Sequence, residues 1–214
     1  MNIATQLTKG ERTRANIVTA AAQLFWLRNF HGVSVDQVAA MAGVNKATVY
    51  RYFSDKSDLA LAVVKYHGAF ATEMFFAANL DRQVPPQVRL ASIIRGIYDT
   101  HNCMSDEHGD VFGCPMMGLA LELGQELPVV RKEAKLIFDA IERNMTLIAT
   151  DAIERTGSNA DPKMIGRTLT QLLHGANASA RLASDASLVL DAGRAALSLI
   201  GFPETNILQE EPSK

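Results

Sequence analysis

The stretch VDQVAAMAGVNKATVYRY, residues 35–52, has the spacing of two short helices joined by a tight turn. Two helices that cross steeply need a small residue where they touch, which Ala39 supplies, and a turn residue that tolerates positive φ, which Gly43 supplies. The second helix would present a short, basic and aromatic face, formed by Lys46, Ala47, Thr48, Tyr50 and Arg51. Such a face suits the major groove of DNA, so the pattern favours a helix-turn-helix; an ordinary helical hairpin is the alternative.

The residues around this stretch predict where its helices begin. Ser34 and Gln37 have the spacing of a capping box, in which each side chain satisfies a free N–H group at the helix start. Asn45 can cap the second short helix, and Asp55 can cap the helix that follows. Ahead of them, a long helix with apolar residues at helical spacing is expected to stop at Gly32.

The rest of the chain predicts an all-α protein of about nine helices. Apolar residues recur at helical spacing, and alternating β-branched runs bounded by tight-turn residues are absent. The fourth helix is expected to cover about residues 56–80, because Pro85 and Pro86 mark the next break. Further helices are expected at residues 87–104, 115–124, 128–156, 162–182 and 186–200.

Length and composition exclude several classes of protein. With 214 residues, 48% of them hydrophobic, the chain can bury a core without a disulfide or a metal. No run approaches the roughly 18–20 apolar residues of a membrane helix, and the start of the chain lacks a secretion signal, so we expect a cytoplasmic protein. Residues 1–60 carry seven Lys and Arg against four Asp and Glu, whereas the remainder carries fourteen against nineteen. A basic lobe on an acidic body suggests a polyanion partner for the lobe, although such an excess can also be plain solvated surface.

Residues 32–59, GVSVDQVAAMAGVNKATVYRYFSDKSDL, are similar throughout to the DNA-binding segment of the tetracycline-repressor (TetR) family of bacterial transcriptional regulators. AAAQLF, residues 20–25, fits the preceding helix of that family. The motif combines Gly-x-Ser before the first short helix, Ala-Gly-Val at the turn, Tyr-x-Tyr-Phe at the end of the second, and a Lys opening the fourth helix. The resemblance implies a homodimeric repressor that binds a palindromic operator in double-stranded DNA and responds to a small-molecule effector. When bound to DNA, such a protein would be associated with the nucleoid.

The resemblance also implies roles for single residues. Three residues at the start of the recognition helix would face base edges, namely Lys46, Ala47 and Thr48. Tyr50, Tyr52 and Lys56 would hold phosphates, and Arg51 could do either job. Ser34 is also a candidate phosphate contact, because it stands at a helix start whose free N–H groups favour an anion. Helix starts and tyrosine hydroxyls can donate to phosphate oxygens, which supports this division. Packing between helices is the alternative for Tyr50 and Tyr52.

The last two predicted helices are suited to pairing with a second copy of the chain. A single short helix reads only a few base pairs, so two half-sites read by a dimer are the usual route to specificity. The resemblance implies an interface of four helices that includes Gly175, Ala178, Ser179, Leu182, Leu188, Ala192, Ala195 and Leu199. Packing inside a single chain is the alternative for these residues.

Residues 60–200 are where the family places a ligand-binding body. The segment FGCPMMGLALELGQELPVVR, residues 112–131, looks like the corresponding stretch of one subset of these regulators, some of which respond to small, electrophilic or oxidising compounds. If the same packing applies, residues on several helices would line the cavity: Phe70, Met74, Ile97, His101, Cys114, Met117, Leu121, Phe138, Ile141, Met145 and His174. Plain core packing is the alternative for each of them.

The stretch HNCMSDEHGDVFGCP, residues 101–115, holds both cysteines and two of the five histidines. Their spacings match no common zinc template, so we expect no metal site and no cofactor. We expect a surface loop over residues 105–113 with two partly buried cysteines. The alternative is a thiol-sensing repressor, in which the helix start stabilises the thiolate of Cys114 and Cys103 resolves it as a disulfide. A cysteine-dependent enzyme is a remote alternative, because the sequence offers no recognisable oxyanion loop or phosphate cradle.

The sequence therefore predicts a regulator rather than an enzyme, without a membrane partner. We expect a helix-turn-helix domain at residues 1–56, an effector-binding and dimerisation domain at residues 57–203, and a disordered tail at residues 204–214.

Overall fold

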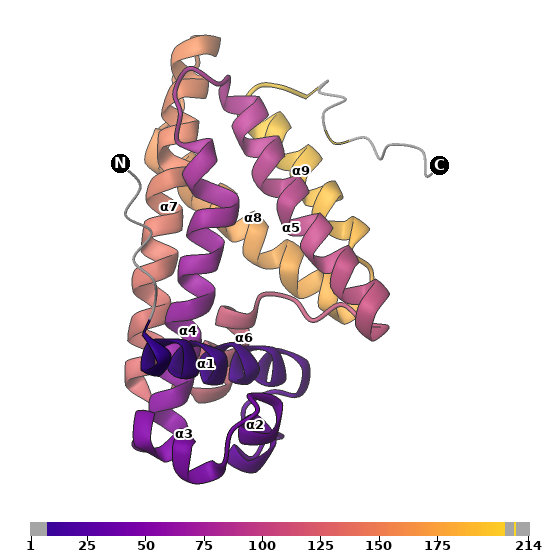
Figure 1. Cartoon of the computed structure of the whole chain (residues 1–214). Coiled ribbons are helices and arrows are strands. Elements are labelled where there is room, and N and C mark those ends of the chain that lie inside the picture. The colour runs from indigo at the N-terminus through magenta and orange to yellow at the C-terminus, as the bar shows by residue number, and fades with distance from the viewer. Residues whose placement is uncertain (1–7, 204–207, 209–214) are drawn as a thin grey trace. The chain divides into compact units, whose positions relative to one another are not determined.

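The computed structural model describes residues 8–203 and residue 208, and these residues form nine α-helices and no strand (Figure 1). The all-α prediction is therefore confirmed. The helices are α1 (Lys9–Arg28), α2 (Val35–Met41), α3 (Lys46–Tyr52), α4 (Lys56–Ala71), α5 (Pro86–His108), α6 (Pro115–Leu123), α7 (Pro128–Thr156), α8 (Pro162–Ala183) and α9 (Ser187–Leu199).

The chain divides into two compact units. The first unit contains residues 8–69 and 115–135, and the second contains residues 70–114, 136–203 and 208. The first unit therefore includes α6 and the start of α7, besides the N-terminal helices. The functional boundary between residues 56 and 57 stays a prediction. Of the predicted tail, only Leu208 belongs to the described residues, and it is buried; the rest lies outside them.

The helix starts in the first unit form as their sequences predict. The Ser34 backbone N–H donates to Gln37 Oε1 over 2.7 Å, and the Gln37 N–H donates to Ser34 Oγ over 3.2 Å, which completes the capping box of α2. Asn45 Oδ1 accepts from the Thr48 N–H at the start of α3 over 2.8 Å. These bonds join residues three positions apart, so they depend on local sequence alone.

The end of α1 differs from the sequence-based expectation. The helix stops at Arg28, and Asn29, with φ of 59°, takes the C-terminal cap that we assigned to Gly32. With ψ of 171°, Asn29 lies outside the left-handed helical region in which asparagine usually adopts positive φ. Gly32 is needed for a different reason, because a Cβ atom there would lie 2.4 Å from the Arg28 carbonyl oxygen. The turn therefore folds back tightly on the end of α1.

The core of the first unit lies among α1, α2, α3 and the start of α4. Its side chains are almost fully buried and include Ile17, Phe25, Val38, Val49, Phe53, Leu59 and Val63. At the turn between α2 and α3, Ala39 is buried and Gly43 has φ of 67°, as the sequence predicts. Helix α6 also packs against α1. The two short helices are thus held by the longer ones, since helices of seven residues are marginal by themselves.

In the second unit, α9 packs against both α5 and α8 (Figure 1). The core is a cluster of aliphatic side chains that includes Leu90, Ile93, Ile94, Met145, Ile148, Leu169, Val189, Leu190 and Leu197. Small residues let the helices approach closely: a Cβ atom at Gly193 of α9 would lie 2.6 Å from Ile94 Cγ2. A Cβ atom at Gly166 of α8 would collide with Thr146 of α7 in the same way.

Two helix ends also differ from expectation. Helix α4 ends at Ala71 and continues as a π-helical turn (Thr72–Phe76) and a 3-10 turn (Ala77–Asn79), where one helix up to residue 80 was predicted. Helix α5 runs to His108, so residues 105–108 are helical rather than part of a loop. Gly109, with φ of 76°, ends α5 and donates its N–H to the Ser105 carbonyl.

A buried ion cluster joins the start of α5 to α7. The carboxylate of Asp151 accepts hydrogen bonds from both Arg82 and Arg89, and the Arg89 side chain is only 1% exposed. Burial by itself raises the pKa of Asp151, but the hydrogen bonds and charges of the two arginines outweigh it, so the pKa lies below its ordinary value. The ionised carboxylate is therefore the form that stabilises the folded chain.

Replacing Asp151 by Asn should lower the free energy of unfolding by about 3–5 kcal/mol near neutral pH, because the buried Arg89 loses its counter-charge. A lowered pKa means that Asp151 contributes its stability above about pH 4 and loses it as the pH falls through the folded-state pKa. The difference between the two proteins in urea unfolding should therefore shrink below about pH 4. Glu154→Gln is the control, because Glu154 is exposed and its pair with Arg82 spans 3.4 Å; its cost should stay below about 1 kcal/mol. An equal cost for both variants would contradict the role given to Asp151.

Candidate functional site

Helix α3 presents its polar residues outward and its apolar residue inward. Lys46, Ala47 and Arg51 are exposed, Tyr50 is 46% exposed, and Val49 is 2% exposed. Two other predicted DNA contacts on α3, Thr48 and Tyr52, are half-buried, and Ser34 ahead of α2 is exposed. The structure therefore brings a polar, basic and aromatic face together on one short helix.

The tyrosines of α3 differ in their surroundings. Tyr50 points to solvent, whereas the Tyr52 hydroxyl lies near Gly10 of α1, 3.5 Å from where a Cβ atom of that glycine would be. The Arg51 guanidinium lies over the Tyr52 ring, 5.2 Å from its centroid. Tyr52 thus makes packing contacts within the first unit, while Tyr50 has the exposure that a phosphate contact needs.

Lys46 forms an ion pair that the sequence analysis missed. Its ammonium lies 2.8 Å from the Asp36 carboxylate on α2, and both side chains are at least half exposed. The hydrogen bond to Asp36 raises the pKa of Lys46. The two residues are ten positions apart, and only the tight turn at Gly43 brings them together. An acidic residue therefore stands beside the first residue of the recognition helix.

Lys56 points into the first unit. Its ammonium donates a hydrogen bond to the Phe30 carbonyl oxygen and lies 4.0 Å from the centroid of the Phe30 ring. Burial lowers its pKa, and the charge of Glu122 opposes that effect. The proposed contact of Lys56 with phosphate stays a prediction, and it requires the ammonium to leave the Phe30 carbonyl.

Glu122 of α6 binds the turn that follows α1. Its two carboxylate oxygens accept hydrogen bonds from the backbone N–H groups of Phe30 and His31, over 2.9 and 3.0 Å. A carboxylate that accepts two such bonds makes a strong, directional contact. Glu122 and Phe30 are 92 residues apart, so no local pattern reveals the pairing. Together with Lys56, Glu122 fixes the segment that leads into α2.

The predicted effector residues are distributed over both units. In the second unit, His101 Nε2 contacts Asn177 Oδ1 over 2.8 Å, and the rings of Phe138 and His174 lie 4.6 Å apart. Ile141 and Met145 are buried in the core, with Ile97 packed against it. Phe70 and Met74 are 41% and 59% exposed, and in the first unit Leu121 is 78% exposed and Met117 half-buried. Their role as pocket residues stays a prediction.

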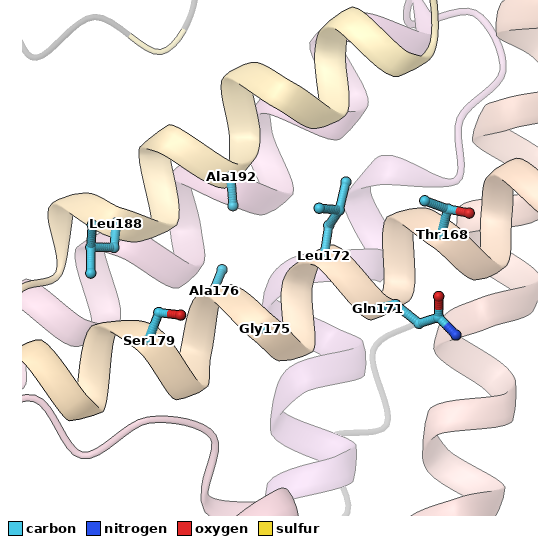
Figure 2. Close-up of a pocket in the computed structure, with 8 residues that line it drawn as sticks. All are labelled: Thr168, Gln171, Leu172, Gly175, Ala176, Ser179, Leu188 and Ala192. Carbon is cyan, nitrogen blue, oxygen red and sulfur yellow. The ribbon is translucent and has the colours of Figure 1, made fainter.

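A groove with a volume of about 440 Å³ runs along the seam of α8 and α9, and Figure 2 shows the residues that line it. Leu188 and Ala192 of α9 point toward α8, and Leu172 and Ala176 of α8 point toward α9. Thr168, Gln171, Gly175 and Ser179 complete the lining, so the groove contains four of the residues predicted for the interface: Gly175, Ser179, Leu188 and Ala192. The other four predicted interface residues, Ala178, Leu182, Ala195 and Leu199, are exposed, and the exposed fraction is 90% for Leu182 and 39% for Leu199.

The cysteine stretch is partly helical. Cys103 lies on α5 and is exposed, which differs from the partly buried position expected for it, whereas Cys114 is half-buried directly before α6. In the described structure both carry thiols and do not form a disulfide. No group of three or more His, Cys, Asp or Glu side chains within the described residues is arranged to hold a metal ion. Thiol sensing at Cys114 stays a prediction.

None of the described helices combines the length and the apolar composition that a membrane crossing requires. The described fold also resembles solved regulators. The structure of a TetR transcriptional regulator from Chloroflexus aurantiacus matches 91% of this chain and 96% of its own, with 24% identity and a TM-score of 0.74. Escherichia coli NemR in its reduced form matches 89% of this chain and 99% of its own, with 21% identity and a TM-score of 0.72. At these identities the likeness concerns the fold.

Curated relatives are regulators too. The repressor BepR of Brucella suis is 25% identical over 181 residues, which are 78% of this chain and 85% of BepR. An uncharacterised helix-turn-helix regulator of Lactococcus lactis is 25% identical over 133 residues, or 62% of this chain. The chain spans 66% of that relative and 28% of the activator FasR of Mycolicibacterium smegmatis, which is 39% identical over 62 residues.

Two family models match the chain. The model for bacterial regulatory proteins of the tetR family covers residues 17–63, which include α2, α3 and most of α1. The model for the tetracyclin repressor-like C-terminal domain covers residues 89–196, about half of the chain. Because both matches fall on the helices described above, the chain belongs to the TetR family of helix-turn-helix transcriptional regulators.

Proposed function

We propose that this chain is a repressor that binds a palindromic DNA operator as a homodimer and changes its DNA affinity when a small molecule binds in the second unit. The exposed polar face of α3 carries the DNA-binding part of the proposal. Lys46, Ala47 and Thr48 would read base edges from the start of α3. Ser34, Tyr50, Tyr52 and Lys56 would hold phosphates, with Arg51 able to do either.

The groove on α8 and α9 supports the dimer. Its small residues would let two helices from a partner copy approach closely, and its apolar side chains would then be buried away from water. Leu182, which is also predicted for the interface, is 90% exposed, so its side chain is open to contact with a partner copy. Pairing would also place two copies of α3 on two half-sites, as a palindrome requires.

Helix α6 supports a connection between effector and operator. In the second unit, the loop before α6 packs on α8, because a Cβ atom at Gly113 would lie 3.1 Å from the Asn177 carbonyl oxygen. In the first unit, Glu122 of the same helix holds the backbone that leads into α2. A ligand that moves the loop would therefore act on α6 by chain continuity, and through Glu122 on the DNA-binding helices.

The proposal is tested by selecting duplexes from a random pool with the purified full chain. We expect a two-fold symmetric sequence bound by two copies, with an affinity that falls linearly with log salt concentration. A compound that stabilises the protein in a thermal-shift screen should then change operator affinity by the same factor by which operator changes the affinity for the compound. A selected site without symmetry, or stabilising compounds that all leave operator affinity unchanged, would contradict the proposal.

The pair of Lys46 and Asp36 should set operator preference. Asp36→Asn frees the Lys46 ammonium for any phosphate, so binding to all duplexes should tighten and the salt slope should steepen by up to about one unit. Lys46→Ala should instead change the preference at one base position, by about 1–3 kcal/mol. Both are measured by fluorescence anisotropy on operator variants and unrelated DNA, with the exposed Lys163 replaced by Ala as control. If Lys46→Ala instead weakens binding to all duplexes equally, Lys46 does not read a base edge.

Gly175→Glu should separate the dimer without unfolding the chain. A Cβ atom at Gly175 would meet no other atom within 4 Å, so the new side chain has room in a single copy but places a charge in the groove. We expect the dissociation constant of the dimer to rise at least about tenfold, since an unpaired charge would be buried. Analytical ultracentrifugation measures the dissociation of the dimer, and circular dichroism checks that the chain stays folded. Gln83→Glu is the control, because it adds the same charge at an exposed site outside α8 and α9. An intact dimer in Gly175→Glu would place the interface elsewhere.

A further inference from the structure

A buried histidine in the second unit has one ring nitrogen without a partner. His101 of α5 is 2% exposed, and its Nε2 lies 2.8 Å from Asn177 Oδ1 on α8. Its other nitrogen, Nδ1, is closed to solvent and finds no hydrogen-bond partner among the described residues. Buried polar atoms are almost always paired, so an orphan nitrogen needs an explanation.

The Asn177 amide settles which nitrogen of His101 carries the proton. Its Nδ2 group donates to the Leu173 carbonyl oxygen over 2.7 Å, which turns Oδ1 toward the imidazole. An amide oxygen only accepts hydrogen bonds, so Nε2 of His101 must be the donor. Burial lowers the pKa of His101, which keeps the ring neutral at physiological pH. Nδ1 therefore carries a lone pair, and it can accept a hydrogen bond but cannot donate one.

Uncharged side chains, two of them polar, lie near His101 on α5, α7 and α8. His174 lies three residues before Asn177 on α8, and its ring contacts Phe138 of α7 at 4.6 Å. Burial lowers the pKa of His174 as well, and no charged group contributes to the pKa shift of either histidine. Ile97, one turn before His101 on α5, and Phe138 are partly buried against the core. These residues form the His101 cluster: Ile97, His101, Phe138, His174 and Asn177.

We propose that the effector is an uncharged small molecule whose hydroxyl or N–H group donates a hydrogen bond to His101 Nδ1, while its apolar part packs against Phe138 and Ile97. This inference rests on the proposed function only in placing the effector in the second unit. A charged ligand would lose its hydration without meeting an opposite charge in the cluster. A purely apolar ligand would leave the buried acceptor unpaired.

The ligand must also open its own space. Because Nδ1 is closed to solvent, a bound molecule has to displace a neighbouring side chain. Phe138 and His174 are only partly buried, so they can move with less loss of packing than the fully buried Met145. The backbone carbonyl oxygen of Asn177 packs against Gly113, in the loop that leads into α6. A ligand that displaces Asn177 would therefore move the loop that we propose to carry the signal.

The test compares molecules that differ in a single donor. Phenol and anisole, and benzyl alcohol and its methyl ether, are matched pairs with and without an O–H group, and benzoate adds a charge. Affinity for the full chain is measured by calorimetry without DNA, and the Nδ1 resonance of His101 is followed in the 15N-labelled protein. We expect each alcohol to bind at least about tenfold more tightly than its ether and than benzoate, and to shift the Nδ1 resonance.

Two histidine variants separate the acceptor from the fold. His101→Phe combined with Asn177→Leu removes the acceptor at Nδ1 without leaving either partner of the hydrogen bond buried and unpaired. We expect this double variant to fold and to bind alcohol and ether equally. His108→Phe removes the ring nitrogens of a histidine that contacts Phe112 instead, and it should keep the preference of the natural chain.

The proposal is overturned if alcohols and ethers bind the natural chain equally, or if the double variant His101→Phe with Asn177→Leu keeps the preference. It is also overturned if no alcohol shifts the Nδ1 resonance, which would mean that an internal water or closed packing accounts for that nitrogen. Because no DNA is present, a failure of operator binding leaves this result untouched. If alcohols bind as expected but operator affinity does not respond, the proposed regulation fails while the ligand chemistry stands.

Discussion

The carboxylate of Glu122 binds the backbone N–H groups of Phe30 and His31, and the DNA-binding helices depend on that contact. The turn after α1 has lost its helical partners, so these N–H groups need acceptors from elsewhere. Lys56 binds the Phe30 carbonyl from the other side of the same peptide segment. A single short segment is thus held by α6 and by the start of α4, and α2 begins only a few residues later.

Helix α3 depends on its neighbours for its position. Seven residues do not hold a helix in water, so the recognition helix is positioned by its buried Val49, by the α2 helix against which it packs, and by the caps at Ser34 and Asn45. The polar residues of α3 are then free to face outward. The pairing of Lys46 with Asp36 adds a second control, because the cation at the start of α3 already has a carboxylate partner in the chain itself.

The second unit relies on close packing and on a few buried polar groups. At Gly166, α8 packs against the backbone of Thr146 on α7, and at Gly193, α9 packs against a methyl group of Ile94 on α5. Neither place has space for a larger side chain. Asp151 pairs with Arg82 and Arg89, although Nε and Nη1 of the buried Arg89 find no hydrogen-bond partner among the described residues, and Nδ1 of His101 is likewise unpaired. A folded domain tolerates such an atom when another requirement outweighs its cost, and ligand recognition is the requirement that we propose for Nδ1 of His101.

The sequence by itself determined the local features of this chain: the caps at Ser34, Asn45 and Asp55, the turn at Gly43, the helical class and the family motif. The caps and the turn depend on residues within about four positions, where backbone geometry leaves few alternatives, and the helical class depends on the periodic spacing of apolar residues. Only the tertiary structure decided that Lys56 points inward to Phe30, that Asp36 meets Lys46, that Glu122 reaches across 92 residues, and that His101 lacks a partner for Nδ1. These contacts join elements that are distant in the chain, and they depend on how helices pack, which residue spacing alone does not encode.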